Sequence, residues 1–240
     1  MARWTPGSQT FWGLSMTFRT GIYRALMLAV LLVAPLAAHA QSDQQLIVDR
    51  ARATVSDLSH DKAFGNARQL LVRARAVLIV PRLFKGGFIV GGEGGTGVLL
   101  ARGPAGTWSN PAFYALGSAS FGLQAGLEQS EVIMLVMTQR GLDALMRDQF
   151  KIGAQAGIAV ANLGSGVEGA VTPGGPDIVV WSSSSGIYGG LALNGSIVRP
   201  QPEDNARYYG RPLTTSDILF RHIGVAPRAN ALRTALATIG

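Results

Sequence analysis

The stretch ARAVLIVPRLFKGGFIVGGEGGTGVLLAR, Ala74 to Arg102, decides the fold of this chain. Its first part, AVLIV from Ala76 to Val80, is apolar and rich in β-branched residues, which is typical of a buried strand. We expect that strand to end at Pro81, because proline cannot donate a ladder hydrogen bond. GFIVGG and TGVLLA follow, and the glycine-dense residues 93–95 between them predict a tight hairpin turn.

The glycines of this stretch also resemble a phosphate-binding loop. Residues 91–97 read GGEGGTG, but the G-K-[ST] ending of such loops is missing. Neither a strand–helix unit nor an acidic residue at the required spacing supports a dinucleotide fold. A glycine-rich hairpin therefore accounts for this run better than a nucleotide site does.

The segments on either side predict a mixture of helices and strands. Apolar residues recur at helical spacing from Asp43 to Leu58, and again from Lys62 to Arg75, where basic side chains run along one margin. Further strands are expected at residues 113–127, 130–138, 151–161, 177–185 and 186–198, and further short helices at residues 139–150, 202–210, 214–220 and 226–240.

A weak repeat indicates the shape of the sheet. GLQAGL at residues 122–127 is echoed at residues 153–158 and 186–191. In a strand, the glycines at positions i and i+4 lie on one face, and glycine in strands marks sharp curvature or close backbone approach. The sequence therefore predicts an α+β fold with a strongly curved, glycine-rich antiparallel β-sheet that closes toward a barrel or sandwich. An N-terminal helix pair and short C-terminal helices complete the fold.

The N-terminal region has the pattern of a targeting segment. Arginines are its only charged residues, an uncharged apolar core runs from Ala25 to Ala34, and residues 38–40 read AHA, a small-x-small cleavage pattern. The core is much shorter than the roughly 20 residues of a membrane-spanning helix. We expect a signal peptide over residues 1–40 and a single domain over residues 41–240.

Composition is consistent with export. The chain has no cysteine, which excludes a lipoprotein anchor and a disulfide framework. We expect a periplasmic or secreted protein, whether translation starts at Met1 or at Met16. The formal net charge of +7 falls to +4 when the three arginines of the signal peptide are removed, and this mild excess does not predict a nucleic acid partner.

No pattern of residues predicts catalysis or a cofactor. The histidines after the signal peptide are His60 and His222, and no metal-ligand spacing accompanies them. A G-x-S-x-G nucleophile motif is absent. Glu93, Glu128 and Glu168 could serve acid–base chemistry if they converged, but exposed turn acids are the simpler interpretation. We expect no enzyme activity, no metal and no cofactor.

A basic run is the best candidate for a binding surface. No acid occurs between Asp61 and Glu93, whereas six basic residues do. Phe84 and Phe88 bracket Lys85, and an aromatic ring beside a cation suits a lipid headgroup boundary; packing of the rings in the core is the alternative. The candidate lipid-binding residues are Arg68, Arg73, Arg75, Arg82, Phe84, Lys85 and Phe88.

Three motifs resemble the SYLF domain family, a lipid-binding module first noted in eukaryotic membrane-trafficking and actin-patch proteins. They are AVLIVP with KGGFIVGGEGGTGVLLAR, then WSNPAF with GLQAG, and finally NARYYG with SDIL, and together they span about Leu46 to Leu236. The resemblance implies binding to phosphoinositides and other anionic lipids through a basic, amphipathic N-terminal part. Here that part comprises the two helices before Ala76, together with Arg82 and Lys85.

We therefore expect a non-enzymatic domain that docks on anionic phospholipid headgroups at a periplasmic membrane face. Cardiolipin, phosphatidylglycerol and lipid A are the anions that such a protein would meet. Some eukaryotic members of the family bind actin, which we do not expect of an exported protein. The alternative is a structural or protein-interaction module of the cell envelope that uses its curved sheet.

Overall fold

A computed structural model describes Met1 and residues 43–60, 67–87, 90–121, 126–153, 157–162, 166–169, 175–183 and 195–239. Internal contacts divide the chain into two units, Met1–Gln41 and Ser42–Gly240. The expected signal peptide and its cleavage site lie outside the described residues, as do most residues of the three repeat copies. The second unit contains the described helices and strands.

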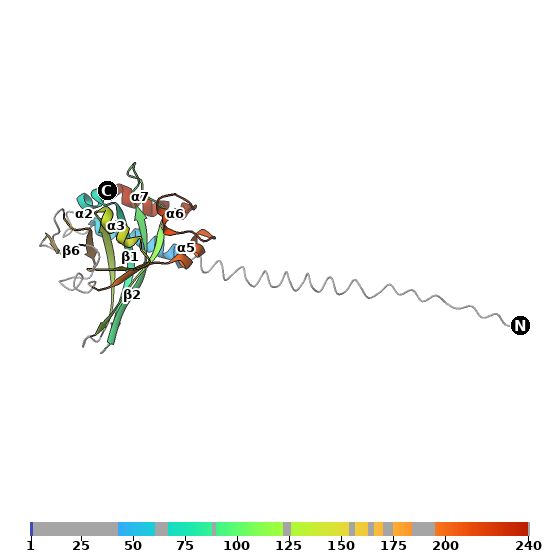
Figure 1. Ribbon diagram of the computed structural model, residues 1–240, viewed down its shortest axis with the longest axis horizontal. Coiled ribbons are helices and arrows are strands. Elements are labelled where there is room, and N and C mark those ends of the chain that lie inside the picture. Colours follow the sequence, from blue (N-terminus) through green and yellow to red (C-terminus); the bar gives the residue numbers. More distant parts are fainter. Residues whose placement is uncertain are drawn as a thin grey trace. The chain divides into compact units, whose positions relative to one another are not determined.

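One curved sheet forms the centre of this unit (Figure 1). Its nine described strands are β1 (Ala76–Gly87), β2 (Val90–Ala101), β3 (Ala112–Phe121), β4 (Gly126–Val136), β5 (Phe150–Lys151), β6 (Ile158–Asn162), β7 (Gly166–Gly169), β8 (Ile178–Ser182) and β9 (Ile197–Pro200). The order is β5-β9-β3-β2-β1-β4-β8-β6-β7, and all pairs from β5 to β8 are antiparallel. β6 pairs with β8 in parallel and with β7 antiparallel. The α+β class and the curved antiparallel sheet are thus confirmed.

The expected end of the first strand at Pro81 is wrong. β1 continues through Pro81 to Gly87, and its register shifts between Ile79 and Phe84 with respect to β2 and between Val80 and Leu83 with respect to β4. The shift is a β-bulge, where a residue is left out of the ladder. Proline is tolerated at such a position because no ladder hydrogen bond is required of its nitrogen.

The expected turn at residues 93–95 is also wrong. These residues lie inside β2, and the chain reverses between Gly87 and Val90 instead. Two glycines of β2 are needed for packing against β1. A Cβ on Gly95 would lie 2.3 Å from the carbonyl oxygen of Arg82, and a Cβ on Gly97 would lie 2.2 Å from that of Ile79. The glycines therefore permit close approach of a neighbouring backbone rather than a turn.

Both faces of the sheet are covered. On one face, Val77 and Ile79 pack in a cluster with the helix over residues 43–60, α2 (Ala67–Arg73) and α7 (Asn230–Ile239). On the other face, Leu78 and Val80 pack with α3 (Gln139–Leu145) and α6 (Thr215–Leu219). In Figure 1 the helices gather at one end of the long strands, and the β1–β2 hairpin extends away from them.

The helices largely follow their sequence patterns. Residues 43–60 are helical, and Val48, Ala51, Val55 and Leu58 are buried, which confirms the first helix. The second expected helix is shorter than the pattern, since α2 ends at Arg73; residues 61–66 are outside the described part. α5 (Pro202–Tyr209), the short 3-10 helix η2 (Pro227–Ala229) and α7 lie within the expected C-terminal ranges.

Two of the motifs that carry the family resemblance dock on each other. The side-chain oxygen of Asn205 accepts a hydrogen bond of 2.8 Å from the backbone N–H of Phe113, and the Tyr209 hydroxyl donates one of 2.7 Å to the carbonyl of Pro111. The rings of Phe113 and Tyr208 lie 5.2 Å apart between centroids. WSNPAF and NARYYG therefore join α5 to the start of β3, which is an architectural role.

Candidate functional site

A groove with a volume of about 850 Å³ lies beside the N-terminal helix. Its walls come from that helix and from β1, β2, β3 and β9. The side chains that give it its chemical character are Ile47, Arg50, Arg82, Phe84, Ile197 and Arg199. The groove thus combines three guanidinium groups with an apolar lining.

The bulge in β1 places two of these side chains. Leu83 is buried in the hydrophobic cluster that also contains Leu78 and Val80, whereas Arg82 and Phe84 on either side of it line the groove. Phe84 is 54% exposed, although it is one of the largest apolar side chains of the strand. Its cross-strand partner on β2 is Gly94, which also lines the groove and offers no side chain to cover the ring.

The groove carries an excess of positive charge. Within the described part of the chain, the guanidinium groups of Arg50, Arg82 and Arg199 take part in no ion pair. Glu93 is the acidic residue in the lining, and its carboxylate accepts hydrogen bonds from the hydroxyls of Ser118 (2.9 Å) and Ser196 (2.7 Å). The arrangement suits an anion that also has an apolar portion.

Of the residues singled out in the sequence, the structure places Arg82 and Phe84 in the groove. Lys85 is half-buried and does not belong to the lining; its register partners are Glu93 on β2 and Glu128 on β4. Phe88 lies outside the described residues.

The other basic candidates lie at the far end of β1. Arg68 belongs to α2, Arg73 is exposed at its last position, and Arg75 is exposed and donates a hydrogen bond of 3.4 Å to Gln139. Phe84 follows Arg75 by nine positions, about 30 Å of extended strand. The structure therefore does not bring these arginines together with Arg82.

Sequence reasoning missed Arg50 and Arg199. Arg199 alternates with buried Val198 on β9, a period-two signal for an outward side chain. Arg50 follows Ile47 by one helical turn, so both lie on the same side of the N-terminal helix. Neither signal shows that two such distant residues meet Arg82, because that depends on the order of strands in the sheet.

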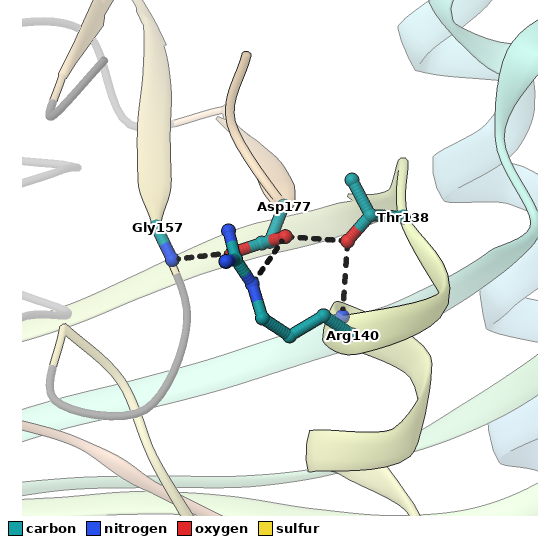
Figure 2. A network of polar contacts seen from close by, with 5 residues as sticks. Thr138, Arg140, Gly157 and Asp177 are labelled. Carbon is teal, nitrogen blue, oxygen red and sulfur yellow. Dashed lines mark hydrogen bonds and ion pairs between the residues drawn. The ribbon is translucent and has the colours of Figure 1, made fainter. Parts of the chain in front are cut away.

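A second polar cluster joins α3 to the sheet (Figure 2). The buried carboxylate of Asp177 forms an ion pair of 2.7 Å with Arg140 and accepts hydrogen bonds from the Thr138 hydroxyl (2.5 Å) and the Gly157 N–H (2.8 Å). Burial acts to raise the pKa of Asp177, but these partners outweigh it and hold the pKa below the ordinary aspartate value. Because its acceptors are engaged and Thr138 also caps α3, this cluster is structural.

The described residues contain no group of three or more His, Cys, Asp or Glu side chains that could hold a metal ion. Glu93 and Glu128 flank Lys85 in register, two strand spacings or about 10 Å apart along the sheet, and Glu168 lies on β7. Glu93 belongs to the lining of the groove. Among the helices that are described, none is long and apolar enough to cross a membrane.

Comparison with known proteins gives a family match over the C-terminal half. A family profile described as "Ysc84: Las17-binding protein actin regulator" matches residues 117–239. No solved structure shows significant similarity to the chain.

Relatives come from animals and yeast. The chain is 28% identical over 169 residues to "SH3 domain-containing YSC84-like protein 1" of Bos taurus, covering 70% of this chain and 49% of the relative. It is 29% identical over 167 residues to "Protein YSC84" of Saccharomyces cerevisiae, covering 68% of this chain and 36% of the relative. It is 28% identical over 190 residues to "LAS seventeen-binding protein 3" of the same yeast, and this match covers 76% of this chain and 41% of the relative. The chain thus spans less than half the length of these relatives, of which the last is named as a binding protein.

Proposed function

The chain belongs to the Ysc84 or SYLF family, and on that premise we propose that it is a non-enzymatic domain that docks on anionic phospholipid headgroups. The observation that carries the proposal is the groove, where Arg50, Arg82 and Arg199 are unpaired within the described chain and Phe84 is exposed beside them. Each Lys or Arg near an anionic membrane contributes about 1 kcal/mol of binding free energy, which salt weakens.

Phe84 adds an apolar contribution to this electrostatic attraction. An aromatic ring next to cations is suited to the boundary between headgroups and acyl chains, where its apolar face leaves water. Lys85, Arg68, Arg73, Arg75 and Phe88 belong to the same proposal as further contacts. Because Arg73 and Arg75 lie at the opposite end of β1 from Phe84, we rank them after Arg82.

We propose the periplasmic face of a membrane as the place of binding. The support is the sequence pattern of the first 40 residues, with its apolar core followed by a small-x-small site, together with the absence of cysteine. Phosphatidylglycerol, cardiolipin and lipid A phosphates are the anionic groups available there.

Vesicle flotation tests the proposal. We expect the protein to float with vesicles that contain phosphatidylglycerol, not with pure phosphatidylcholine vesicles, and to be released as salt is raised. The double substitution Arg82→Glu with Arg199→Glu changes the local charge by −4 and should abolish flotation. Exposed substitutions usually change the free energy of unfolding by about 0.5 kcal/mol or less, so the variant should melt normally.

Arg52→Glu with Arg147→Glu is the matched control. Both residues are exposed and neither lines the groove, so this variant has the same net charge with the groove intact. It should keep most of the flotation. Equal loss of flotation in both double variants would show that total charge, not the groove, governs binding. If the wild-type protein floats equally well with neutral and anionic vesicles, the proposal of anionic lipid binding is wrong.

A second candidate is a protein-binding module of the cell envelope. The relatives' printed names favour it, since the yeast protein is named for binding to LAS seventeen and the family description names actin regulation. If the wild-type protein floats with neither type of vesicle, this candidate replaces the first.

A further inference from the structure

We propose that the groove holds a single phospholipid molecule, with its phosphate between Arg50, Arg82 and Arg199 and the first part of its acyl chains against Phe84 and Ile47. The inference rests on the proposed lipid function but goes further, because it requires a site of one-to-one stoichiometry in place of general attraction to a charged surface.

The groove concentrates positive charge. The three guanidinium groups are brought to one groove by three separate elements, the N-terminal helix, β1 and β9. Like charges in one groove repel each other, and no carboxylate in the described chain pairs with them. A phosphodiester offers two oxygens to planar guanidinium groups, which bind such groups in bidentate geometry.

The shape of the groove supports a ligand at Gly94. Gly95 and Gly97 are required by packing, because a Cβ at either position would lie within 2.3 Å of a backbone oxygen of β1. At Gly94 the nearest atom to such a Cβ would be the carbonyl oxygen of Leu116 at 4.0 Å, so packing does not explain this glycine. It lies in the lining opposite Phe84, where its missing side chain leaves the floor of the groove open.

The size and lining indicate what can enter. Ligand sites commonly have volumes of about 300–1,000 Å³, and the groove has about 850 Å³, which accommodates a headgroup with part of its chains. Ile47, Phe84 and Ile197 provide apolar surface next to the arginines. A free inorganic anion would contact only the guanidinium groups and would leave the apolar side chains exposed to water. An amphiphile would cover both, so the arrangement favours an amphiphile.

Titration calorimetry tests the inference without any membrane. The protein is residues 41–240, and the ligand is dihexanoyl phosphatidylglycerol, kept below the concentration at which it forms micelles. We expect saturable binding of one molecule per chain. Glycerol 3-phosphate and inorganic phosphate are the comparison ligands, and each should bind at least about tenfold more weakly, equivalent to about 1.4 kcal/mol, because neither covers the apolar lining.

Gly94→Leu is the steric test. Gly94 is exposed, lies in β2 and does not have a positive φ, so the variant with leucine at this position should fold. The leucine side chain should fill the floor of the groove. We expect at least tenfold weaker binding of the short-chain lipid, a smaller loss for Gly94→Ala, and an unchanged melting temperature. Arg50→Gln with Arg199→Gln should also lose binding, whereas Arg52→Gln with Arg211→Gln, two exposed arginines outside the groove, should not.

The outcomes separate this inference from the proposed function. Vesicle flotation without binding of the short-chain lipid would overturn the single-molecule site and leave surface docking in place. Normal binding by a well-folded Gly94→Leu variant would also overturn it, as would equally tight binding of glycerol 3-phosphate or phosphate. If neither vesicles nor the short-chain lipid bind, both proposals are wrong.

Discussion

At the scale of single residues, three neighbouring glycines of β2 have different roles. We expect Gly95→Ala and Gly97→Ala to destabilise the protein by about 1–3 kcal/mol, because the new methyl group would meet a backbone oxygen of β1 that can move only if the sheet deforms. Gly94→Ala, which meets nothing closer than 4.0 Å, should change stability little. Urea unfolding of the three variants checks this, and equal effects at all three positions would contradict the assigned roles.

Asp177 gives a residue-scale prediction for acid pH. Its pKa is lower in the folded chain than the ordinary value of about 3.9, so the stabilisation by its carboxylate is fully present above that value. It is lost as pH falls through the lower pKa of the native state. We expect Asp177→Asn to cost about 1–3 kcal/mol at pH 7, because the hydrogen bonds to its charged form are lost.

Comparison of the two proteins between pH 7 and pH 3 measures the effect. The difference in their unfolding free energy should shrink as the carboxylate of the wild-type protein becomes protonated. A difference that stays constant over this range would show that the network of Figure 2 acts through packing and not through charge.

At the scale of elements, the N-terminal helix is joined to the sheet by a hydrogen bond to the carboxylate of Glu131, whose charged form is disfavoured by burial. The Thr54 hydroxyl donates a hydrogen bond of 2.7 Å to Glu131 on β4. Burial raises the pKa of Glu131, the Thr54 hydroxyl lowers it, and Asp57 raises it, with a net increase. A raised pKa in the folded state means that the stability contribution is present at acid pH and is lost as pH rises through that pKa.

Glu131→Gln should therefore stabilise the protein at pH 7.5, since glutamine keeps an acceptor for Thr54 and carries no charge. At a pH below the ordinary glutamate value of about 4.3, the two proteins should melt at nearly the same temperature. Thermal melts at both pH values check this. A lower melting temperature of the variant at pH 7.5 would show that the charged form is favoured at this contact.

At the scale of the whole molecule, the sequence predicted the elements better than their connections. The helix over residues 43–60, with its clear 3.6-residue period, and the short helix within residues 214–220 were found from pattern alone. Pro81 and residues 93–95 were misread, because a bulge in β1 and the approach of its backbone to β2 depend on neighbours in space. The sequence carries proline and glycine at these places but not the reason for them.

The candidate site shows the same limit. Arg82 and Phe84 were found because they lie two residues apart within the basic, glycine-rich stretch from Ala74 to Arg102. Arg50 and Arg199 belong to the same groove, yet they reach it only through the docking of the first helix and the pairing of β9 with β3. Periodicity places a side chain on a face of its own element, whereas the site depends on which faces meet.

β1 is paired on both sides, and its first part is covered on both faces, since every residue from Ala76 to Val80 is fully buried. The two hydrophobic clusters of the domain thus share one strand, with alternate side chains in each. Exposing either cluster to solvent would therefore remove the packing on one face of this segment. The amide protons of Val77 to Ile79 should consequently exchange with solvent only through global unfolding, and the domain should unfold in one cooperative step although it contains two cores.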